Sequence, residues 1–486
     1  MSRIAAKSFA ACVVVGWCVC GAVAFGVELI PQTRAEQWNM RRAWFYQVEM
    51  DRDGARVQNA VVYGGRVYVL TNRGTVQAID LAAGRSLWTR MVGNPNHPSL
   101  GPGVNSMLAA VINGSTLYLI DAGTGSVVKE ERLPGAPGAS PALSDRHAFV
   151  PLTNGKIYAF SFVKQKIESS SADETAPRET EPASADRTSS EPAPARIQLS
   201  HEYQPPLSVQ GTGRSLWPPI VVPFSADWTY CVWVSQAASD REGYLNISVL
   251  ERQVKDSFYV RNRMTAPLGF AAAPAYVLPD PKTAGDRGLV VAAGLDGFVS
   301  GITVEGKLNW KFSTGGSVLT PPVVIDDRVF VCTANDGMFC LDARTGRELW
   351  WAAGVVQFLA SGKSYVYVAD QSRRLVALDA QTGQRHATLL YGDFTYSPAN
   401  DRNDRLVLIS RSGLVQCLHE TQLAEPLNYN VPAAPGSRPA AQQQGLDAGG
   451  EQPAADRPTT RRAEAGDNAP AGNRPQRPQE PADPFQ

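Results

Sequence analysis

Short apolar runs recur along this chain in pairs, and each pair has the alternation of half-buried β-strands. In residues 65–80, two runs rich in Val, Tyr, Ala and Ile flank a turn that contains Asn72 and Gly74, a pattern that predicts a β-hairpin. No stretch within these units keeps a helical period, so we predict an all-β chain. Further copies of the hairpin lie at 147–160, 326–340, 365–377 and 406–418, with weaker copies at 229–250 and 288–302.

A second motif follows several of the hairpins. It consists of Asp-x-x-x-Gly and a further strand that ends near Trp, and its fullest copies are residues 79–88 and 341–350. The Asp can accept hydrogen bonds from backbone amides of its own turn, and the Gly allows a positive φ. Because these residues recur in successive units, we expect them to build the fold rather than an active site. The repeat residues are Asp80, Gly84, Trp88, Asp121, Gly125, Gly306, Trp310, Asp342, Gly346, Trp350, Asp379 and Gly383.

The spacing of the repeat indicates a propeller. Asp80 and Asp121 are 41 residues apart, and Asp342 and Asp379 are 37 apart, close to the roughly 40–45 residues of a four-stranded propeller blade. Without an insertion inside it, the repeat region 38–422 leaves about 43 residues for each of eight units.

The two ends of the repeat region complement each other. Trp44 lies on an N-terminal strand that no hairpin precedes, whereas the last hairpin, 406–418, has no Trp-bearing strand after it. We therefore predict an eight-bladed β-propeller of four-stranded antiparallel blades in which the N-terminal strand closes the last blade, an arrangement that leaves only short, protected edges.

Residues 342–350 and 379–383 resemble the repeat of the PQQ-type (quinoprotein-like) β-propeller family, and the resemblance covers about 38–422. The chain is most similar to the non-catalytic outer-membrane-assembly lipoprotein B type of that family. This resemblance implies an exported scaffold for protein–protein interaction in the periplasm or cell envelope, with a role in outer-membrane protein assembly. The dehydrogenases of the same family imply the alternative, a quinone-dependent oxidoreductase or a small-molecule-binding propeller.

Those dehydrogenases place the quinone beside two adjacent cysteines and use calcium. The chain has no Cys-Cys pair, its five histidines are scattered, and it carries no metal-spaced motif, nucleophile elbow or phosphate-binding loop. We therefore expect a protein that is not an enzyme, with no catalytic, cofactor-binding or metal-binding residues and no cofactor.

Three segments differ in composition from the repeats. Residues 1–26 carry Arg3 and Lys7, an apolar run and an Ala-Val-Ala site, which predicts a signal peptide followed by a lead-in at 27–37; an uncleaved anchor is the alternative. An insertion at 163–200 is acidic and rich in Ser, Ala and Pro, and a tail at 423–486 is rich in Pro, Ala, Gln and Arg. We predict that both are disordered, because neither holds enough apolar surface to fold.

The charge balance bears on the partners. The chain has 46 basic and 46 acidic residues, so it lacks the basic footprint of a nucleic-acid-binding domain. We expect other envelope proteins as partners, no nucleic acid, no integral membrane span after signal removal, and a monomer that works within a complex.

The cysteines leave two interpretations open. Cys332 and Cys340 lie across one predicted hairpin, where a disulfide between them is one alternative. The other is that Cys340 and Cys417 fill the position held by Ala78 and Ala377 in other units, where a small buried residue fits between two sheets. We favour the second.

Overall fold

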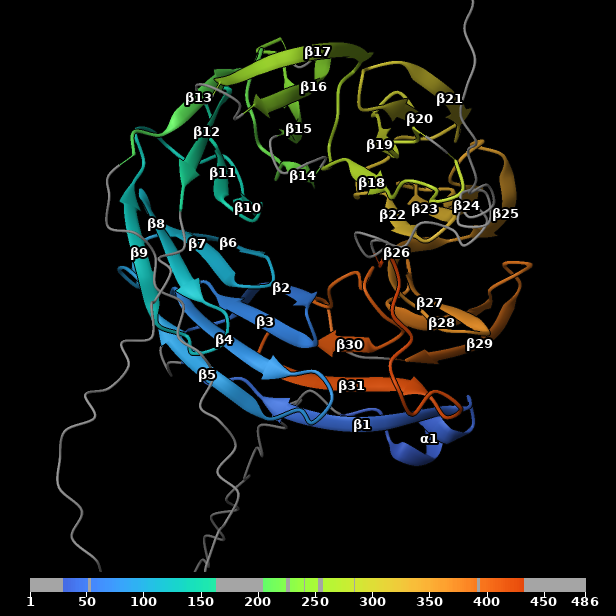
Figure 1. Ribbon diagram of the computed structural model, residues 1–486. Helices are drawn as coiled ribbons and strands as arrows, with labels where there is room; N and C mark the ends of the chain where they lie inside the picture. The colour runs from blue at the N-terminus through green and yellow to red at the C-terminus, as the bar shows by residue number, and fades with distance from the viewer. Residues whose placement is uncertain are drawn as a thin grey trace, which may run out of the picture. The chain divides into compact units, whose positions relative to one another are not determined.

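The computed structural model describes residues 29–50, 54–162, 204–223, 228–239, 241–251, 257–283, 285–390 and 394–431. Eight antiparallel sheets follow one another around a central axis, as the blades of a β-propeller (Figure 1). Apart from the short helix α1 (Gln32–Glu36), the described secondary structure is all β. The predicted fold class and blade number are confirmed.

Seven blades are four-stranded and are each built from one continuous stretch of chain, with the strands in sequence order. Blades 1 to 4 contain β2 (Val57–Tyr63), β3 (Arg66–Thr71), β4 (Thr75–Asp80) and β5 (Ser86–Met91); β6 (Ser99–Val104), β7 (Leu108–Asn113), β8 (Thr116–Asp121) and β9 (Val127–Arg132); β10 (Ala142–Leu143), β11 (His147–Pro151), β12 (Lys156–Ser161) and β13 (Leu207–Gln210); and β14 (Ile220–Pro223), β15 (Trp228–Gln236), β16 (Glu242–Glu251) and β17 (Ser257–Pro267). Blades 5 to 7 contain β18 (Ala275–Val277), β19 (Leu289–Ala293), β20 (Phe298–Thr303) and β21 (Leu308–Ser313); β22 (Val323–Ile325), β23 (Arg328–Cys332), β24 (Gly337–Asp342) and β25 (Glu348–Ala353); and β26 (Val355–Ser361), β27 (Tyr365–Asp370), β28 (Arg374–Asp379) and β29 (Arg385–Leu390).

Blade 8 closes the ring by combining the two ends of the propeller. β30 (Leu406–Ile409) and β31 (Leu414–Glu420) pair with each other, and β1 (Met40–Gln47) adds to β31 as the outer strand. The predicted closure by the N-terminal strand is confirmed. This blade has three strands among the described residues; in the place of an innermost strand, the Tyr396 N–H donates to the Ile409 carbonyl at 3.0 Å.

The hydrophobic core consists of seams in which the facing sides of two neighbouring blades meet. In the seam between blades 8 and 1, Trp44 and Cys417 pack with Val67 and Ile79. Each sheet therefore buries apolar side chains on both of its faces, which explains why strands such as β3 are apolar over most of their length.

The strand register places a small residue opposite each seam tryptophan that the repeat supplies. Cys340 lies opposite Trp350 and Cys417 opposite Trp44, just as Ala78 lies opposite Trp88. These cysteines therefore occupy the position of a small buried residue, as we favoured.

A disulfide between Cys332 and Cys340 is absent. Both thiols are free and buried, and they pair with Met338 and Phe330, respectively, rather than with each other. Their positions at different rungs of the β23–β24 hairpin separate the two sulfur atoms, so the disulfide alternative was wrong.

The structure revises one boundary of the predicted tail. Residues 423–431, which we assigned to the tail, fold back onto the propeller, and Tyr429 is buried; we call this segment the strap. The predicted signal peptide 1–26, the insertion 163–200 and the tail beyond residue 431 lie outside the described residues. Within the described residues, no helix has the length and apolar character needed to cross a membrane.

Candidate interaction face

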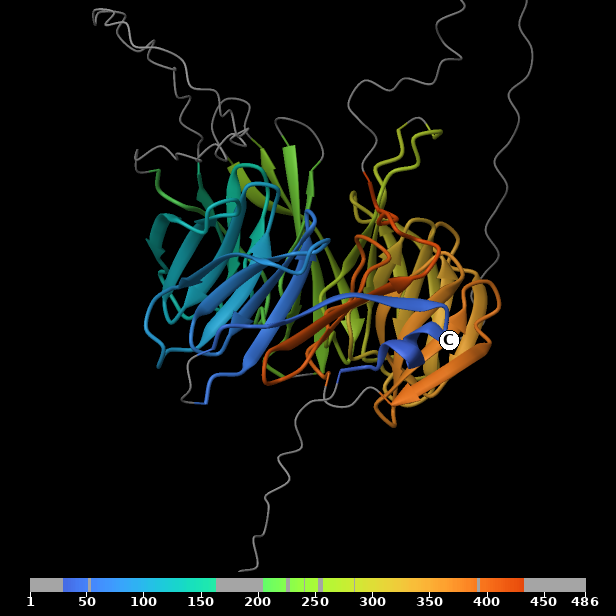
Figure 2. The same ribbon diagram turned by 90° about the horizontal axis from the view of Figure 1, so that it is seen from below.

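The two faces of the propeller carry different connections. We call upper the face that holds the turns between the first and second and between the third and fourth strands of each blade, and lower the opposite face. The upper face is turned toward the viewer in Figure 1 and points upward in Figure 2. Because loops accept changes that strands do not, a function added to a repeat fold is expected on such connections.

The main departures from the repeat lie on the upper face. β12 ends at Ser161 and β13 begins at Leu207, so the longest connection leaves and re-enters the propeller there. The connection between β18 and β19, residues 278–288, and the strap are on the same face (Figure 2). We therefore take the upper face as the candidate site.

Asp286 links the described parts of the 278–288 loop to each other and to blade 6. Its carboxylate accepts hydrogen bonds from the backbone N–H groups of Asp280 (2.7 Å) and Gly288 (2.9 Å) and forms an ion pair with Arg344 of blade 6 (2.7 Å). Burial opposes ionisation of Asp286, but these donors outweigh it and hold its pKa below the usual range. Arg344 also donates to the Leu278 carbonyl, so the loop is braced across the seam between blades 5 and 6.

The predicted repeat aspartates also lie at upper-face turns, but each is engaged in its own turn. One carboxylate oxygen of Asp80 accepts from the Ala83 N–H at 2.6 Å, and that of Asp342 accepts from both the N–H and the hydroxyl of Thr345 at 2.8 Å. Asp121 and Asp379 make the equivalent bonds. These contacts match the turn-building role expected from the sequence.

The repeat tryptophans dock on the turn of the next blade. The indole N–H of Trp88 donates to the Ala122 carbonyl at 2.8 Å, and its ring covers Gly125, where a Cβ would collide with it. Trp350 covers Gly383 in the same way. The remaining pairs of this kind are Trp44 on Gly84 and Trp310 on Gly346.

Four seams thus contain the docked tryptophan, and the repeat residues are spread over them rather than gathered into one site. Gly306 differs from the other repeat glycines. Asn262 of β17 stands against it in place of a tryptophan and donates to the Glu305 carbonyl at 3.0 Å. The seam between blades 4 and 5 is therefore joined by an amide hydrogen bond.

The remaining titratable residues do not assemble a metal site among the described residues: no group of three His, Cys, Asp or Glu side chains is close enough together there. Burial raises the pKa of Cys332, Cys340 and Cys417 to about 12, so these thiols are protonated at neutral pH and are weak nucleophiles. Trp233, a non-repeat aromatic residue of blade 4, is fully buried in the seam with blade 3.

On the lower face, Asp370 joins two strands of blade 7. Its buried carboxylate forms ion pairs with Arg374 (2.7 Å) and Arg385 (3.6 Å) and accepts from the Arg374 N–H at 2.9 Å. Burial opposes ionisation, but these donors prevail and hold the pKa of Asp370 below its usual range. These contacts link β27, which carries Asp370, to β28 and β29.

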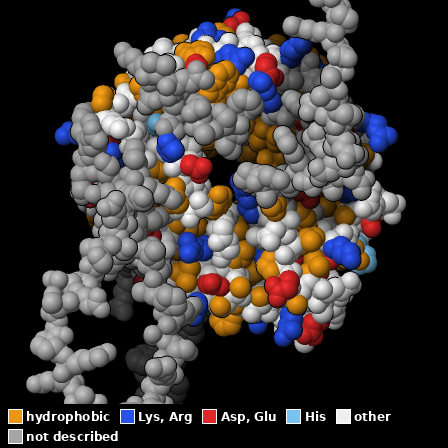
Figure 3. Space-filling view, in the orientation of Figure 1, with side chains coloured by type: hydrophobic (Ala, Val, Ile, Leu, Met, Phe, Trp, Pro, Cys, Tyr) orange, Lys and Arg blue, Asp and Glu red, His pale blue; other side chains and the backbone are white. Residues whose placement is uncertain are grey.

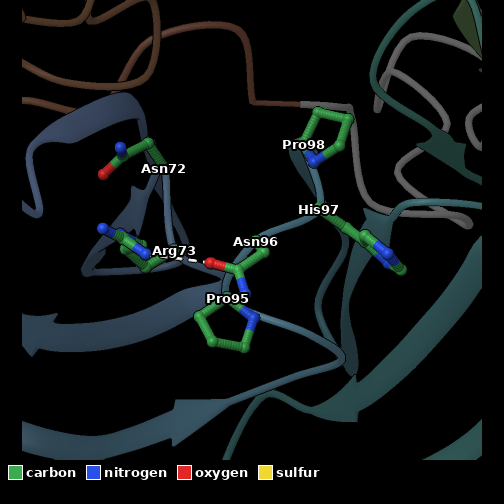
Figure 4. A pocket seen from close by; sticks show the side chains of 6 residues that line it. All are labelled: Asn72, Arg73, Pro95, Asn96, His97 and Pro98. Carbon is green, nitrogen blue, oxygen red and sulfur yellow. Dashed lines mark hydrogen bonds between the residues drawn. The ribbon is translucent and has the colours of Figure 1, made fainter.

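A depression between blades 1 and 2 also opens on the lower face (Figure 4). Arg73 points across it and donates to the Asn96 side chain at 3.3 Å, while the His97 ring points away from Arg73. Asn72, Pro95 and Pro98 complete the lining. The lining contains no carboxylate or thiol, so it supplies no nucleophile–base pair.

Comparison with known proteins gives three kinds of match. Two curated relatives are named polyvinylalcohol dehydrogenase: that of Sphingopyxis sp. (strain 113P3) is 32% identical over 90 residues, 16% of this chain and 14% of the relative, and that of Pseudomonas sp. is 31% identical over the same shares. The chain therefore spans about a seventh of these relatives' length.

Among solved structures, BamB from Moraxella catarrhalis superposes with a TM-score of 0.51 at 15% identity, over 78% of this chain and 97% of that one. This similarity shows a shared fold. The sequence profile of the family described as outer membrane protein assembly factor BamB matches residues 35–193 and 265–441, which together are more than half of the chain. The chain belongs to the BamB-type family of PQQ-like β-propellers.

Proposed function

We propose that the protein is a non-catalytic, exported scaffold of the cell envelope that binds other proteins through its upper face and takes part in outer-membrane protein assembly. The family match, which covers most of the propeller, carries the proposal. The concentration of irregular connections on one face supports it, because a binding surface added to a rigid repeat is built from such loops.

The character of the upper face suits a protein partner. Where described side chains are visible, acidic, basic and apolar groups are interspersed around the ring (Figure 3). A mixed surface of this kind favours a specific protein contact, whereas nucleic acid requires a continuous basic surface. The braced 278–288 loop gives such a contact a pre-formed element, which lowers the entropic cost of binding.

A paired cross-linking experiment tests the proposal. A photo-reactive amino acid replaces exposed Lys282 in the upper-face loop or, as a matched control, exposed Ser372 in the β27–β28 turn of the lower face. We expect the Lys282 variant, and not the Ser372 variant, to cross-link in living cells to a component of the outer-membrane protein assembly machinery. Depletion of the protein should lower the amount of folded barrel protein in the outer membrane.

Unchanged levels of folded outer-membrane protein after depletion would contradict the assembly role. Equal cross-linking from the two faces would contradict the assignment of the upper face. The depletion experiment therefore tests the role in outer-membrane protein assembly, and the cross-linking experiment tests the upper face as the binding surface.

A second candidate function, a quinone-dependent oxidoreductase, is favoured by the local similarity to polyvinylalcohol dehydrogenases. The described residues do not fit the group that such enzymes use, because they contain no acidic cluster for calcium and the chain has no adjacent cysteines. Titration with pyrroloquinoline quinone and calcium, followed by absorbance and by dye reduction, tests it. Saturable binding with dye reduction would replace the scaffold proposal, and the lack of both would remove this candidate.

A further inference from the structure

On the upper face the strap is seated against a wall of the propeller, and we call this seat the groove. The wall is the segment 400–405, which leads into β30. The side-chain amide of Asn400 donates to the Asn403 side chain at 2.8 Å and to the Arg405 carbonyl at 2.7 Å, and the Asn403 side chain accepts from the Arg405 N–H at 3.1 Å. Asn400 and Asn403 are both buried. The wall is therefore held by its own asparagines.

The strap lies along this wall and pairs with it through an isolated antiparallel bridge between Asn403 and Asn428. The Tyr429 N–H donates to the Arg402 carbonyl at 2.8 Å, and the Asp404 N–H donates to the Leu427 carbonyl at 3.1 Å. The Asp404 carboxylate also accepts from the Leu427 N–H at 2.8 Å, and the Arg405 guanidinium donates to the carbonyls at 423 and 424. Most of these bonds use the backbone of the strap, as in recognition of an extended peptide by strand addition.

Two side chains of the strap are recognised individually. Tyr429 is 8% exposed and its hydroxyl donates to the Ser361 carbonyl of blade 7 at 3.0 Å. The amide of Asn430 donates to the Val324 carbonyl of blade 6 at 2.7 Å, and its oxygen accepts from the Asp326 N–H at 3.0 Å. The Asp326 carboxylate accepts from the Asn430 N–H at 2.9 Å, which makes the clasp reciprocal.

The rest of the strap adds little to the core. Leu427 is 38% exposed and Val431 is 67% exposed, and Tyr429 is the one strap residue that is buried. Main-chain bonds along a preformed wall, with specificity from a tyrosine socket and an asparagine clasp, are the features of a peptide-binding site.

We propose that this groove is a peptide-binding site, occupied in cis by the strap, and that its ligand class is an extended peptide with a Tyr-Asn pair. The strap covers the site as an exchangeable intramolecular ligand. Its tether gives it a high effective concentration, so a peptide added in trans gains access when the cis contacts are weakened. This inference does not depend on the proposed assembly role.

The test uses the full chain with Tyr429→Ala and Asn430→Ala, and a fluorescent synthetic peptide with the sequence of residues 423–431. We expect saturable binding to this variant by fluorescence anisotropy. Binding to the unaltered chain should be at least about tenfold weaker, because its own strap competes. A peptide that carries Tyr429→Ala should also bind at least about tenfold more weakly, since it loses a buried ring and a hydrogen bond. A peptide of the same composition in scrambled order is the control.

No binding to a variant that keeps its β-sheet circular dichroism spectrum and cooperative melting would overturn the proposal, and so would equal binding of the scrambled peptide. If the variant does not fold, hydrogen exchange on the unaltered chain decides. The amides of Leu427, Tyr429 and Asn430 should exchange at least about tenfold faster than those of β27 and β28, through local release of the strap. Exchange at the same rate as those strands would show that the strap is an inseparable part of the fold.

Discussion

Replacement of Trp350 by alanine tests whether the docked tryptophans hold neighbouring blades together. Trp350 is 6% exposed, its ring covers Gly383 of the next blade, and its indole N–H donates to the Ala380 carbonyl at 3.2 Å. The neighbouring Trp351 is on the same strand but faces the other side and is 47% exposed. The two residues form a matched pair with the same chemistry and different burial.

The expected cost follows from that burial. Replacement of a buried tryptophan by alanine lowers the free energy of unfolding by about 3–5 kcal/mol, because the lost burial of apolar surface and the cavity left behind both destabilise the fold. The Trp350→Ala variant also removes one of the two donors to the Ala380 carbonyl, which keeps its hydrogen bond from the Arg328 guanidinium. The Trp351→Ala variant loses apolar contact over only about half of the side chain and leaves no enclosed cavity, so we expect about 2 kcal/mol or less.

Thermal and urea unfolding of the full chain, followed by circular dichroism at a fixed scan rate, measures the difference. We expect the midpoint of Trp350→Ala to fall by at least twice the shift seen for Trp351→Ala. Equal shifts would refute the argument, since they would show that docking on the glycine turn contributes nothing beyond ordinary surface packing. An unchanged midpoint for Trp350→Ala would refute it more directly.

Three further predictions follow from local contacts. Gly346→Ala should lower the free energy of unfolding in urea by at least about 1 kcal/mol, because Gly346 has a positive φ and a Cβ there would meet Trp310. Gly315 also has a positive φ but has open space around it, so Gly315→Ala should lower the free energy of unfolding by less. The reverse order would contradict this reasoning. Cys340 should resist alkylation at pH 8 until denaturant is added, as read by mass spectrometry, because its pKa is about 12; rapid labelling of the native protein would contradict its burial. The pKa of Asp370 is lower in the folded protein than the value of about 4 in the unfolded chain, so its ionised carboxylate stabilises the fold above that pH. The free energy of unfolding lost in Asp370→Asn should therefore be largest at pH 7 and should shrink as the pH falls below about 4. A loss that does not depend on pH would contradict the ionic role.

The fold could be predicted because its signals are local. Each hairpin carries its own turn residues, and the docked tryptophans mark the outer strands, including Trp44, whose unpaired strand predicted the ring closure. The seam between blades 4 and 5 carries no such signal, because Asn262 replaces the tryptophan and makes one amide hydrogen bond instead. The repeat pattern of blade 4, which carries Asn262, was correspondingly weak in the sequence.

The strap could not be predicted from composition. Segments that are poor in apolar residues are expected to stay unfolded, and this one holds to the propeller through backbone groups and the amide of Asn430, which composition does not register. Tyr429 was the one available signal, since it is the single aromatic residue of 423–484. The ion pair that braces the 278–288 loop was equally hidden, because Arg344 and Asp286 are 58 residues apart.

The closure of blade 8 also sets an order in time. Seven blades form from contiguous chain and can fold one after another as the chain emerges from its N-terminus. β1 is made early, but its partner β31 ends at Glu420, so the strand that carries Trp44 waits for almost the whole chain. A chain that stops before β31 keeps an open edge, which is the feature that aggregates or is captured by chaperones. Ring closure thus distinguishes a finished polypeptide from an unfinished one.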